Sequence, residues 1–382
     1  MNALKGKNSW GAAARTVLIP CCLVLLILAH FGCDSGTDKL PDSKESFDRR
    51  AMLQHWADQI IIPSYEHYNS KVTVLHVSTD QFTSSPSIEN LMALRTAWKE
   101  AYLAWQWVSM YEIGKAEAIN FRNFTNIFPT NTEGITKNIK SGNYNLELPS
   151  KFAEQGLPAL DYLINGLGKD DQVVVNILGS VDYANYLTDL TSRLSNLSNE
   201  VLSDWKGGFR DRYIENSGSS GTSSVDKTVN DFMYDYEKFL RAGKIGIPAG
   251  VFSGSPIPKA VEARFSPGFS KELFLENLKA SQDFFNGIAF GKDGEGVSLK
   301  SYLDHLGTEK DGAKLSDLIN GQFDKSRETS GLVDSDFAKQ VHQDNTQMLK
   351  LYDELQKNVI LIKVDMMQAL NIAVDYVDAD GD

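Results

Sequence analysis

The chain has 382 residues and a formal net charge of −12. Its 50 acidic residues outnumber the 38 basic ones, which argues against nucleic acid as a partner because a nucleic-acid backbone is itself negatively charged. A single hydrophobic core stops growing at roughly 250–300 residues, so we expect a chain of this length to form two domains.

The first 33 residues are typical of a secretory signal. Three basic residues precede an apolar run at residues 17–29, which is short for a membrane-spanning helix. Gly32 and Cys33 follow and resemble a lipobox, whose cysteine is acylated and becomes the mature N-terminus, although His30 stands where leucine is usual. We therefore predict export, lipidation of Cys33 and attachment to a bacterial membrane, either in the periplasm or at the cell surface.

Removal of the signal changes both the charge and the cysteine content. Residues 1–32 hold three basic and no acidic residues, so the mature chain keeps 35 basic and 50 acidic residues, a net charge of −15. Cys21 and Cys22 lie in the apolar run, and Cys33 is then the only cysteine that remains. This excludes an intramolecular disulfide and thiol catalysis. The alternative, a plain secreted protein, leaves a free thiol in an oxidising compartment.

Apolar side chains recur three and four residues apart along most of the mature chain, which is the pattern of amphipathic helices. We expect Pro63 to kink or end the first of these helices. The pattern predicts an all-α protein built from two antiparallel helical bundles. The six clearest stretches are residues 53–60, 91–108, 183–205, 225–239, 274–288 and 341–366.

Composition suggests where the domains begin and end. Residues 33–48 contain the lipidated cysteine and a polar tether without an apolar stripe. The N-terminal bundle is expected at residues 49–216 and the C-terminal bundle at residues 225–382. Between them, residues 217–224 (SGSSGTSS) have the composition of a flexible linker.

Two further features concern the connections. Residues 114–150 and 242–270 lack a helical period, and long structured loops of this kind are often functional. The sequences GLPALDYL at residues 156–163 and GVSLKSYL at residues 296–303 share a glycine and a Tyr-Leu pair at the same spacing. This faint repeat favours a degenerate internal duplication that relates the two bundles.

Familiar catalytic motifs are absent from the sequence. The mature chain has five histidines, and none lies in a His-Glu-x-x-His arrangement that would place two zinc ligands on one helical face. There is no Gly-x-Ser-x-Gly elbow, phosphate-binding loop or dinucleotide fingerprint. The sequence therefore has no zinc motif and identifies no catalytic residue.

Several stretches together resemble imelysin-like proteins over roughly residues 50–375. LRTAWKEAYLAW at residues 94–105, followed by YEIG at 111–114, is similar to the aromatic helix and Glu-x-Gly turn of that family. GLPALDYL at residues 156–163 aligns with its Gly-x-His-x-x-Glu signature. RAGKIGIP at residues 241–248, with SPIPKAVE at 255–262, resembles the loop that joins the family's two halves.

The resemblance implies an all-helical protein of two related bundles that works outside the cytoplasm. The family includes iron-regulated lipoproteins, is often encoded with iron-uptake functions, and is catalogued among metallopeptidases. In this chain Pro158 replaces the signature histidine and Asp161 replaces the glutamate. Because proline offers a metal neither a lone pair nor a donor, the signature cannot form a His/Glu metal site here.

The altered signature has two interpretations. Pro158 suits the first turn of a helix, and Gly156 gives the chain freedom to enter that turn, so Asp161 could cap the helix start. Alternatively, Asp161 and free N–H groups could line a small polar pocket.

Charged residues beside the aromatic clusters and in the Pro-rich loop also allow two interpretations. A buried ion pair could tie the loop with Glu262 and Arg264 to the first bundle, where Arg95, Glu112 and Arg122 lie. Alternatively, Arg95, Glu112, Asp161 and Glu262 form the rim of one cleft between the halves. The predicted ligand pocket comprises Arg95, Glu112, Gly156, Pro158, Asp161, Tyr162, Gly246, Pro248 and Glu262.

The favoured functional hypothesis is a membrane-anchored, non-catalytic binding protein in iron or haem uptake, with a pocket between its domains and possibly an iron-uptake protein as partner. Its iron or haem ligand follows from the resemblance alone. One alternative is a metal-dependent peptidase whose ligands lie outside the signature. A second is a structural or partner-docking lipoprotein without a small ligand.

Overall fold

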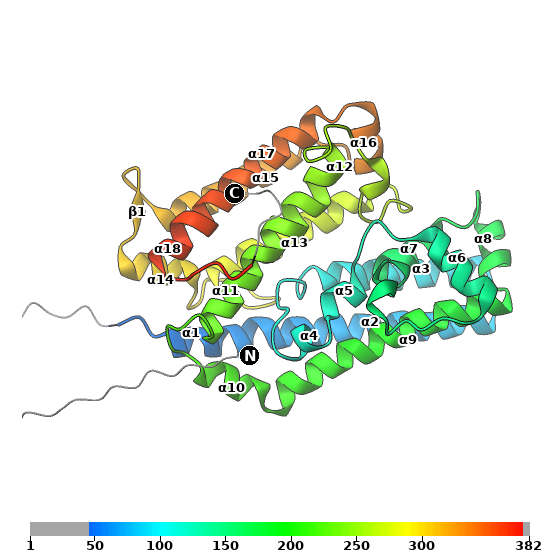
Figure 1. The fold of residues 1–382 in the computed structure, drawn as a ribbon, viewed down its shortest axis with the longest axis horizontal. Coiled ribbons are helices and arrows are strands. Elements are labelled where there is room, and N and C mark those ends of the chain that lie inside the picture. Colours follow the sequence, from blue (N-terminus) through cyan, green and yellow to red (C-terminus); the bar gives the residue numbers. More distant parts are fainter. Residues whose placement is uncertain (1–45, 377–382) are drawn as a thin grey trace, which may run out of the picture. The chain divides into compact units, whose positions relative to one another are not determined.

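Helices form almost all of the regular structure in the computed structural model, which describes residues 46–376 (Figure 1). Two short strands, β1 (Glu309–Lys310) and β2 (Ala313–Lys314), form an antiparallel pair joined by a short turn. The all-α prediction is therefore confirmed. Within residues 46–376, no helix is both long enough and apolar enough to cross a bilayer. The predicted signal, Cys33 and residues 34–45 of the tether lie outside the described residues.

The N-terminal helices pack around α2 (Ile62–Ser84), which lies between α3 (Ile88–Trp105) and α9 (Val181–Asp204). Apolar positions spaced three and four apart on these helices are the buried ones, as the sequence pattern predicts. The other elements of this group are α1 (Arg49–His55), η1 (Trp56–Ile61), α4 (Lys115–Ala118), α5 (Phe121–Thr125), α6 (Thr132–Ser141), η2 (Pro149–Glu154), α7 (Gly156–Asn165), α8 (Asp171–Leu178), η3 (Trp205–Phe209) and α10 (Arg210–Glu215).

The C-terminal helices form a second group, in which α17 (Thr346–Val359) packs against α15 (Leu315–Ser330) and η4 (Asp235–Gly246). Figure 1 labels α13, α15 and α17 in the upper part of the view. The other elements are α11 (Ser224–Tyr234), α12 (Ile247–Ala249), η5 (Pro258–Ala260), α13 (Phe269–Asn286), α14 (Leu299–Leu306), α16 (Phe337–Gln343), η6 (Ile360–Met366) and α18 (Met367–Ala369).

The two groups meet through aromatic side chains. Trp98 on α3 contacts Phe269 on α13 with ring centroids 5.3 Å apart, and Trp56 contacts Phe284 at 4.9 Å. Such buried aromatic pairs contribute beyond the area that they bury. Ser223 is fully buried and its hydroxyl caps α11, so this helix begins at the end of the segment predicted as a linker. The domain boundary itself stays a prediction.

Pro63 does not end its helix. The chain runs from α1 through η1 into α2 without a break, and η1 has wide π-helical turns in which the Ile62 N–H bonds to the carbonyl of Ala57. These turns already depart from the regular i→i−4 pattern, so the missing N–H of proline is tolerated just after them. Of the two effects predicted for Pro63, a kink or a helix end, the helix end is therefore wrong.

Both segments predicted to lack helices contain them. Residues 114–150 hold α4, α5 and α6, of which the first two are too short to show a period. Residues 242–249 continue the wide helix η4 and then α12. Nearly every side chain of η4 is at least half-buried, so this helix has no polar face from which an amphipathic period could be recognised.

The start of α7 depends on a glycine. Gly156 has φ of +77°, and a Cβ at this position would lie 2.2 Å from the carbonyl oxygen of Thr125 at the end of α5. In the predicted repeat, Gly296 instead lies two residues before Ser298, the cap of α14. The two glycines therefore have different places in the structure, and the internal duplication is not confirmed.

We expect Gly156→Ala to destabilise the protein more than Gly142→Ala does. Gly142 also has a positive φ (+59°), but nothing lies within 4 Å of its Cβ position. The control should therefore cost only about 1–2 kcal/mol, the penalty for a left-handed backbone, whereas Gly156→Ala adds a clash with backbone. Urea unfolding measures both variants, and equal losses of stability would contradict the close approach of α5 and α7.

Candidate functional site

Arg95, a predicted pocket residue, holds the N-terminal helices together. Its Nε donates to the carbonyl of Ile164 at 2.9 Å, and its Nη1 donates to the Asp171 carboxylate at 2.7 Å. These contacts connect α3 to the end of α7 and the start of α8. Arg95 does not meet the other three predicted rim residues.

Asp161 does not cap α7. Pro158 lies in the first turn of this helix, as predicted, but the helix begins at Gly156 and Asp161 falls in its second turn. The Asp161 carboxylate accepts hydrogen bonds from the backbone N–H of Phe265 at 2.9 Å and from the Asn165 amide at 3.1 Å. Its role is to fix the loop after η5, so the prediction of a helix cap is wrong.

The space beside Asp161 is too small for a ligand. Burial raises the pKa of its carboxyl to about 6, while the Phe265 N–H, the Asn165 and Ser266 side chains and the charge of Arg264 oppose that rise. The hollow that Asp161 and Pro158 border has a volume of about 10 Å³. A volume of this size holds about one water molecule.

Glu262 forms the buried ion pair that the sequence suggested for the Pro-rich loop, but with a different cation. Its partner is Lys244 of η4, and both side chains are more than nine-tenths buried. The other Glu262 oxygen accepts from the Asn126 amide at 2.9 Å, and Asn126 in turn accepts from the Tyr102 hydroxyl at 2.6 Å. The ion pair therefore fixes the loop within the C-terminal group, and Asn126 connects it to the N-terminal group.

The remaining predicted pocket residues lie apart from one another. Tyr162 packs on the ring of Phe265 at 5.3 Å and lines an open hollow beside α6. A Cβ on Gly246 would lie 2.8 Å from the ring of Tyr352, so this glycine allows close packing. Pro248 is buried and its carbonyl accepts the N–H of Ile257 at 2.8 Å.

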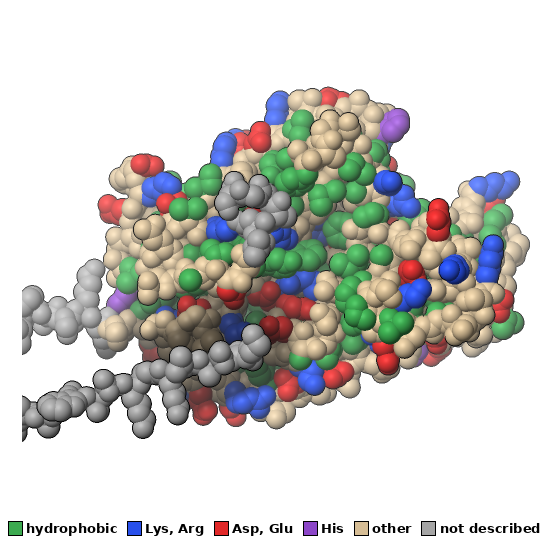
Figure 2. Space-filling view, viewed as in Figure 1, with side chains coloured by type: hydrophobic (Ala, Val, Ile, Leu, Met, Phe, Trp, Pro, Cys, Tyr) green, Lys and Arg blue, Asp and Glu red, His purple; other side chains and the backbone are tan. Residues whose placement is uncertain are grey.

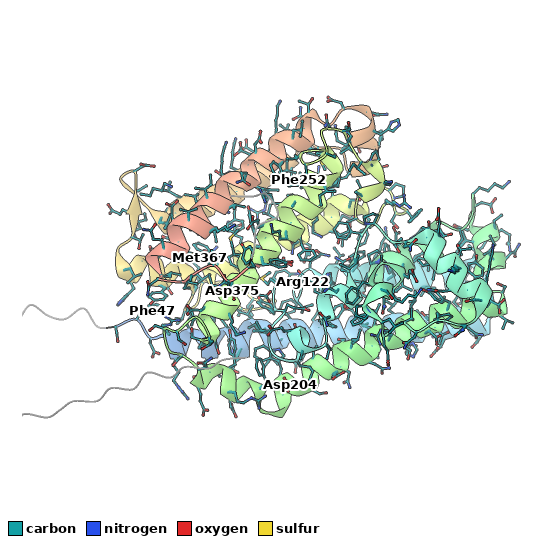
Figure 3. The ribbon with its side chains drawn as sticks, in the orientation of Figure 1. Phe47, Arg122, Asp204, Phe252, Met367 and Asp375 are labelled. Carbon is teal, nitrogen blue, oxygen red and sulfur yellow. The ribbon has the colours of Figure 1, made fainter. Side chains whose placement is uncertain are left out.

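A cavity of about 360 Å³ lies between the two groups of helices, and we call it the Arg122 pocket. Figure 2 shows acidic side chains in a hollow on this face, and Figure 3 places Arg122 between the groups. Of the predicted pocket residues, only Glu112 lines it. The lining residues are Glu112, Ile113, Glu117, Arg122, Lys227, Asn230, Asp231, Tyr234, Asp375 and Tyr376.

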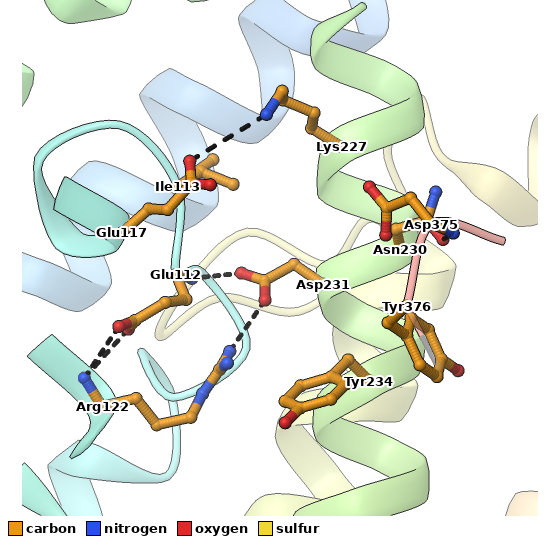
Figure 4. A pocket seen from close by; sticks show the side chains of 10 residues that line it. All are labelled: Glu112, Ile113, Glu117, Arg122, Lys227, Asn230, Asp231, Tyr234, Asp375 and Tyr376. Carbon is orange, nitrogen blue, oxygen red and sulfur yellow. Dashed lines mark hydrogen bonds and ion pairs between the residues drawn. The ribbon is translucent and has the colours of Figure 1, made fainter. Parts of the chain in front are cut away.

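Arg122 organises one wall of the pocket (Figure 4). Its Nε and Nη2 donate to the carbonyl of Ser109 at 2.9 and 2.7 Å, and Nη2 also donates to Asp231 on α11 at 2.9 Å. Its backbone N–H lies 3.0 and 3.1 Å from the two carboxylate oxygens of Glu112. The backbone N–H of Glu112 donates to the second oxygen of Asp231.

The carboxyl groups of this wall hold protons more tightly than usual. Burial raises the pKa of Glu112 to about 8, against the opposing charge of Arg122. Burial likewise raises the pKa of Asp231 to about 6, and it raises the pKa of Asp235, four residues further along the chain. The single guanidinium of Arg122 therefore lies near three carboxyl groups, those of Glu112, Asp231 and Asp235. This region has more acidic groups than positive charges to pair with them.

The opposite wall comes from α11 and the segment after α18. Asn230 donates to the carbonyl of Ala373 at 2.9 Å and accepts the N–H of Asp375 at 3.0 Å. The ring of Tyr376 lies against Tyr234 with centroids 5.2 Å apart. These contacts hold the segment across the pocket beside α11.

Sequence reasoning missed Asp231, Tyr234 and the segment with Asp375. Asp231 occupies a polar position on an amphipathic helix, where a carboxylate in a pocket has the same pattern as one in solvent. Arg122 was identified only as a charge beside aromatic residues. The segment at residues 373–376 follows the last apolar stripe and carries no motif.

The pocket's chemistry is that of charged and phenolic groups. Within residues 46–376 there is no cysteine and no group of three or more His, Cys, Asp or Glu side chains placed to hold a metal ion. Carboxylates, a guanidinium and an ammonium can position a polar or charged ligand by hydrogen bonds and ion pairs.

Comparison with known proteins confirms the resemblance seen in the sequence. The family model described as Imelysin matches residues 61–361. Iron-regulated protein A of Synechococcus elongatus is 26% identical over 83 residues. That match covers 22% of this chain and 23% of the curated relative, so it spans about a quarter of that protein's length.

Two solved structures share the fold. An imelysin-like protein from Psychrobacter arcticum superposes with a TM-score of 0.66 at 18% identity, covering 86% of this chain and 97% of that one. A protein described as an iron-regulated protein A precursor, from Parabacteroides distasonis, gives a TM-score of 0.69 at 16% identity, covering 85% and 97%. At these identities the likeness establishes the fold alone.

We expect Glu112 to make the protein less stable as pH rises. Its pKa is about 8 in the folded state against an ordinary value near 4.5, so the folded protein keeps a proton that the unfolded chain releases. Stability should fall by about 1–2 kcal/mol between about pH 6.5 and about pH 8.5. In Glu112→Gln, urea unfolding should show a smaller fall. Glu89→Gln, at an exposed carboxylate that does not influence Glu112, is the control, and an unchanged slope in Glu112→Gln would contradict this assignment.

We expect Glu262→Gln to destabilise the protein by about 3–5 kcal/mol, because it leaves the Lys244 ammonium buried without a counter-charge. The double variant Glu262→Gln with Lys244→Met removes both charges and should recover much of that loss. Denaturant unfolding of the two variants is the measurement. A double variant as unstable as the single one would show that the ion pair is not the source of the effect.

Proposed function

The chain belongs to the imelysin family, and from that premise we propose that it is an exported, membrane-anchored and non-catalytic binding protein that acts in iron or haem acquisition. The similarity to Iron-regulated protein A and to an iron-regulated protein A precursor supports the connection with iron. The signal-like residues before Cys33 and the lipobox-like Gly32 support export and a lipid anchor.

The observation that carries the proposal is the Arg122 pocket. Its volume of about 360 Å³ is within the usual range of small-ligand sites, roughly 300–1,000 Å³. Both groups of helices contribute to its walls, so a bound ligand contacts both. Four carboxyl groups line it against two cationic side chains. With Glu112 protonated at neutral pH, three carboxylates still face two cations, and this excess favours a ligand with positive charge, such as an iron ion.

The altered signature favours binding over peptidase chemistry. Pro158 has no lone pair for a metal, and the Asp161 carboxylate is already occupied by the Phe265 N–H and the Asn165 amide. The hollow beside them has room for about one water molecule. A peptide substrate therefore has no space at the position where the family signature lies.

Iron binding should depend on the exposed carboxylates of the pocket. We expect the double variant Glu117→Gln with Asp375→Asn to bind ferrous ions at least about tenfold more weakly, about 1.4 kcal/mol, because it removes two negative charges that attract a cation. These two side chains are chosen because the buried Arg122 network does not depend on them. Titration of the purified protein by calorimetry, with haem also followed by its absorbance, measures the affinity.

The control carries the same change of charge elsewhere. Glu89→Gln with Asp182→Asn alters two exposed carboxylates outside the pocket, and this variant should bind as the unaltered protein does. Saturable binding that is equally strong in both double variants would move the ligand away from the Arg122 pocket. The absence of saturable binding to ferrous ions, to ferric citrate and to haem would overturn the proposed function.

A further inference from the structure

A second cavity adjoins the Arg122 pocket. It has a volume of about 380 Å³, and we call it the Phe209 chamber. Ile113, Glu117 and Lys227 line both cavities, so the two cavities border each other at these three residues. Figure 4 shows Glu117 and Lys227 together at one end of the Arg122 pocket, away from Arg122.

The polar partition between the two cavities is weak. The Lys227 ammonium and the Glu117 carboxylate are 4.0 Å apart, and their side chains are 46% and 62% exposed. An ion pair of this exposure contributes little to stability because water screens it. A ligand can therefore displace these two side chains at small cost and extend from one cavity into the other.

The two cavities have different walls. The Phe209 chamber is bordered by the rings of Phe209 and Tyr213, whose centroids are 6.2 Å apart. Gly114 lets the Phe209 ring lie against the loop, because a Cβ there would be 2.5 Å from the ring. This chamber therefore offers apolar surface, whereas the Arg122 pocket offers charged groups.

Charge pairing within the Arg122 pocket leaves an excess of carboxylate. Arg122 pairs with Asp231, and Lys227 pairs with Glu117. Among residues 46–376, neither Glu112 nor Asp375 forms an ion pair with a cationic side chain, and the Glu112 oxygens share the single backbone N–H of Arg122. A positively charged group in this pocket would lie beside these two carboxyl groups and would favour release of the proton that Glu112 otherwise holds up to about pH 8.

We propose that the Arg122 pocket and the Phe209 chamber form one elongated site for a cationic amphiphile, with its positive group beside Glu112 and Asp375 and its apolar chain against Phe209 and Tyr213. This inference rests on the proposed function's assignment of the Arg122 pocket as the ligand site and goes beyond the iron or haem ligand. It adds the ligand's chemical class and names Glu117 and Lys227 as the side chains that move aside.

The test uses alkyl probes of one charge and increasing length. Ethylammonium, butylammonium and hexylammonium are titrated into the purified full chain, and hexanoate serves as the probe of opposite charge. We expect affinity to rise about three- to fourfold for each added methylene that enters the Phe209 chamber. Hexanoate should bind at least about tenfold more weakly than hexylammonium.

A variant that fills the chamber separates its role from that of the pocket. Thr222 is exposed and lines only the Phe209 chamber, so Thr222→Trp should abolish the dependence on chain length while ethylammonium binding stays unchanged. Ser219→Trp places the same ring on the same loop outside the chamber and should keep the dependence. Both residues are exposed, so either substitution should leave the fold intact. Circular dichroism checks that both variants are folded.

Each outcome decides between the two proposals. An affinity that does not rise with chain length, a tighter complex with hexanoate, or an unchanged length dependence in Thr222→Trp would overturn the elongated cation site. Iron or haem binding without any length dependence for the ammonium probes would leave the proposed function standing and refute this inference. Length-dependent ammonium binding without iron or haem binding would refute the proposed function alone.

Discussion

The burial of one guanidinium group determines how the two groups of helices meet. The Arg122 side chain is only 7% exposed, and a charge removed from water must be paired and hydrogen-bonded to be tolerated. The Ser109 carbonyl satisfies it from the N-terminal group, and Asp231 satisfies it from α11. Separation of the two groups of helices would leave the Arg122 cation and the Asp231 carboxylate unpaired. This contact therefore sets the distance between the two groups and maintains the Arg122 pocket between them.

The short helix α5 makes two such connections from one face. Arg122 and Asn126 are four residues apart, and the Asn126 N–H bonds to the Arg122 carbonyl at 2.9 Å. The first residue reaches Asp231, and the second reaches the Glu262 that pairs with Lys244. Because both contacts are buried and charged, a five-residue helix that is unstable alone is fixed on both sides. The pocket wall is therefore rigid where the ligand's charge would lie.

Sequence could predict the helices but only part of the site. Apolar spacing shows which face of a long helix is buried, and this sufficed for α3 and α9. It fails for η4, where Lys244 lies in a helix buried on nearly all sides. The sequence analysis identified Glu112, Asp161 and Glu262 as candidate site residues. Sequence spacing, however, does not specify which residues become their partners across the fold. Asp231 in particular has the same local pattern as a solvent-facing residue.

The altered signature still serves the pocket, through packing. Gly156 brings the start of α7 against the carbonyl of Thr125, at the end of the helix that carries Arg122. The Trp98 indole fixes the same turn by donating to the Leu157 carbonyl at 3.0 Å. Neither contact involves the side chain at position 158, so proline there leaves α5 in place. The signature's glycine is thus a packing requirement for the Arg122 wall, separable from any metal chemistry of the histidine that this chain lacks.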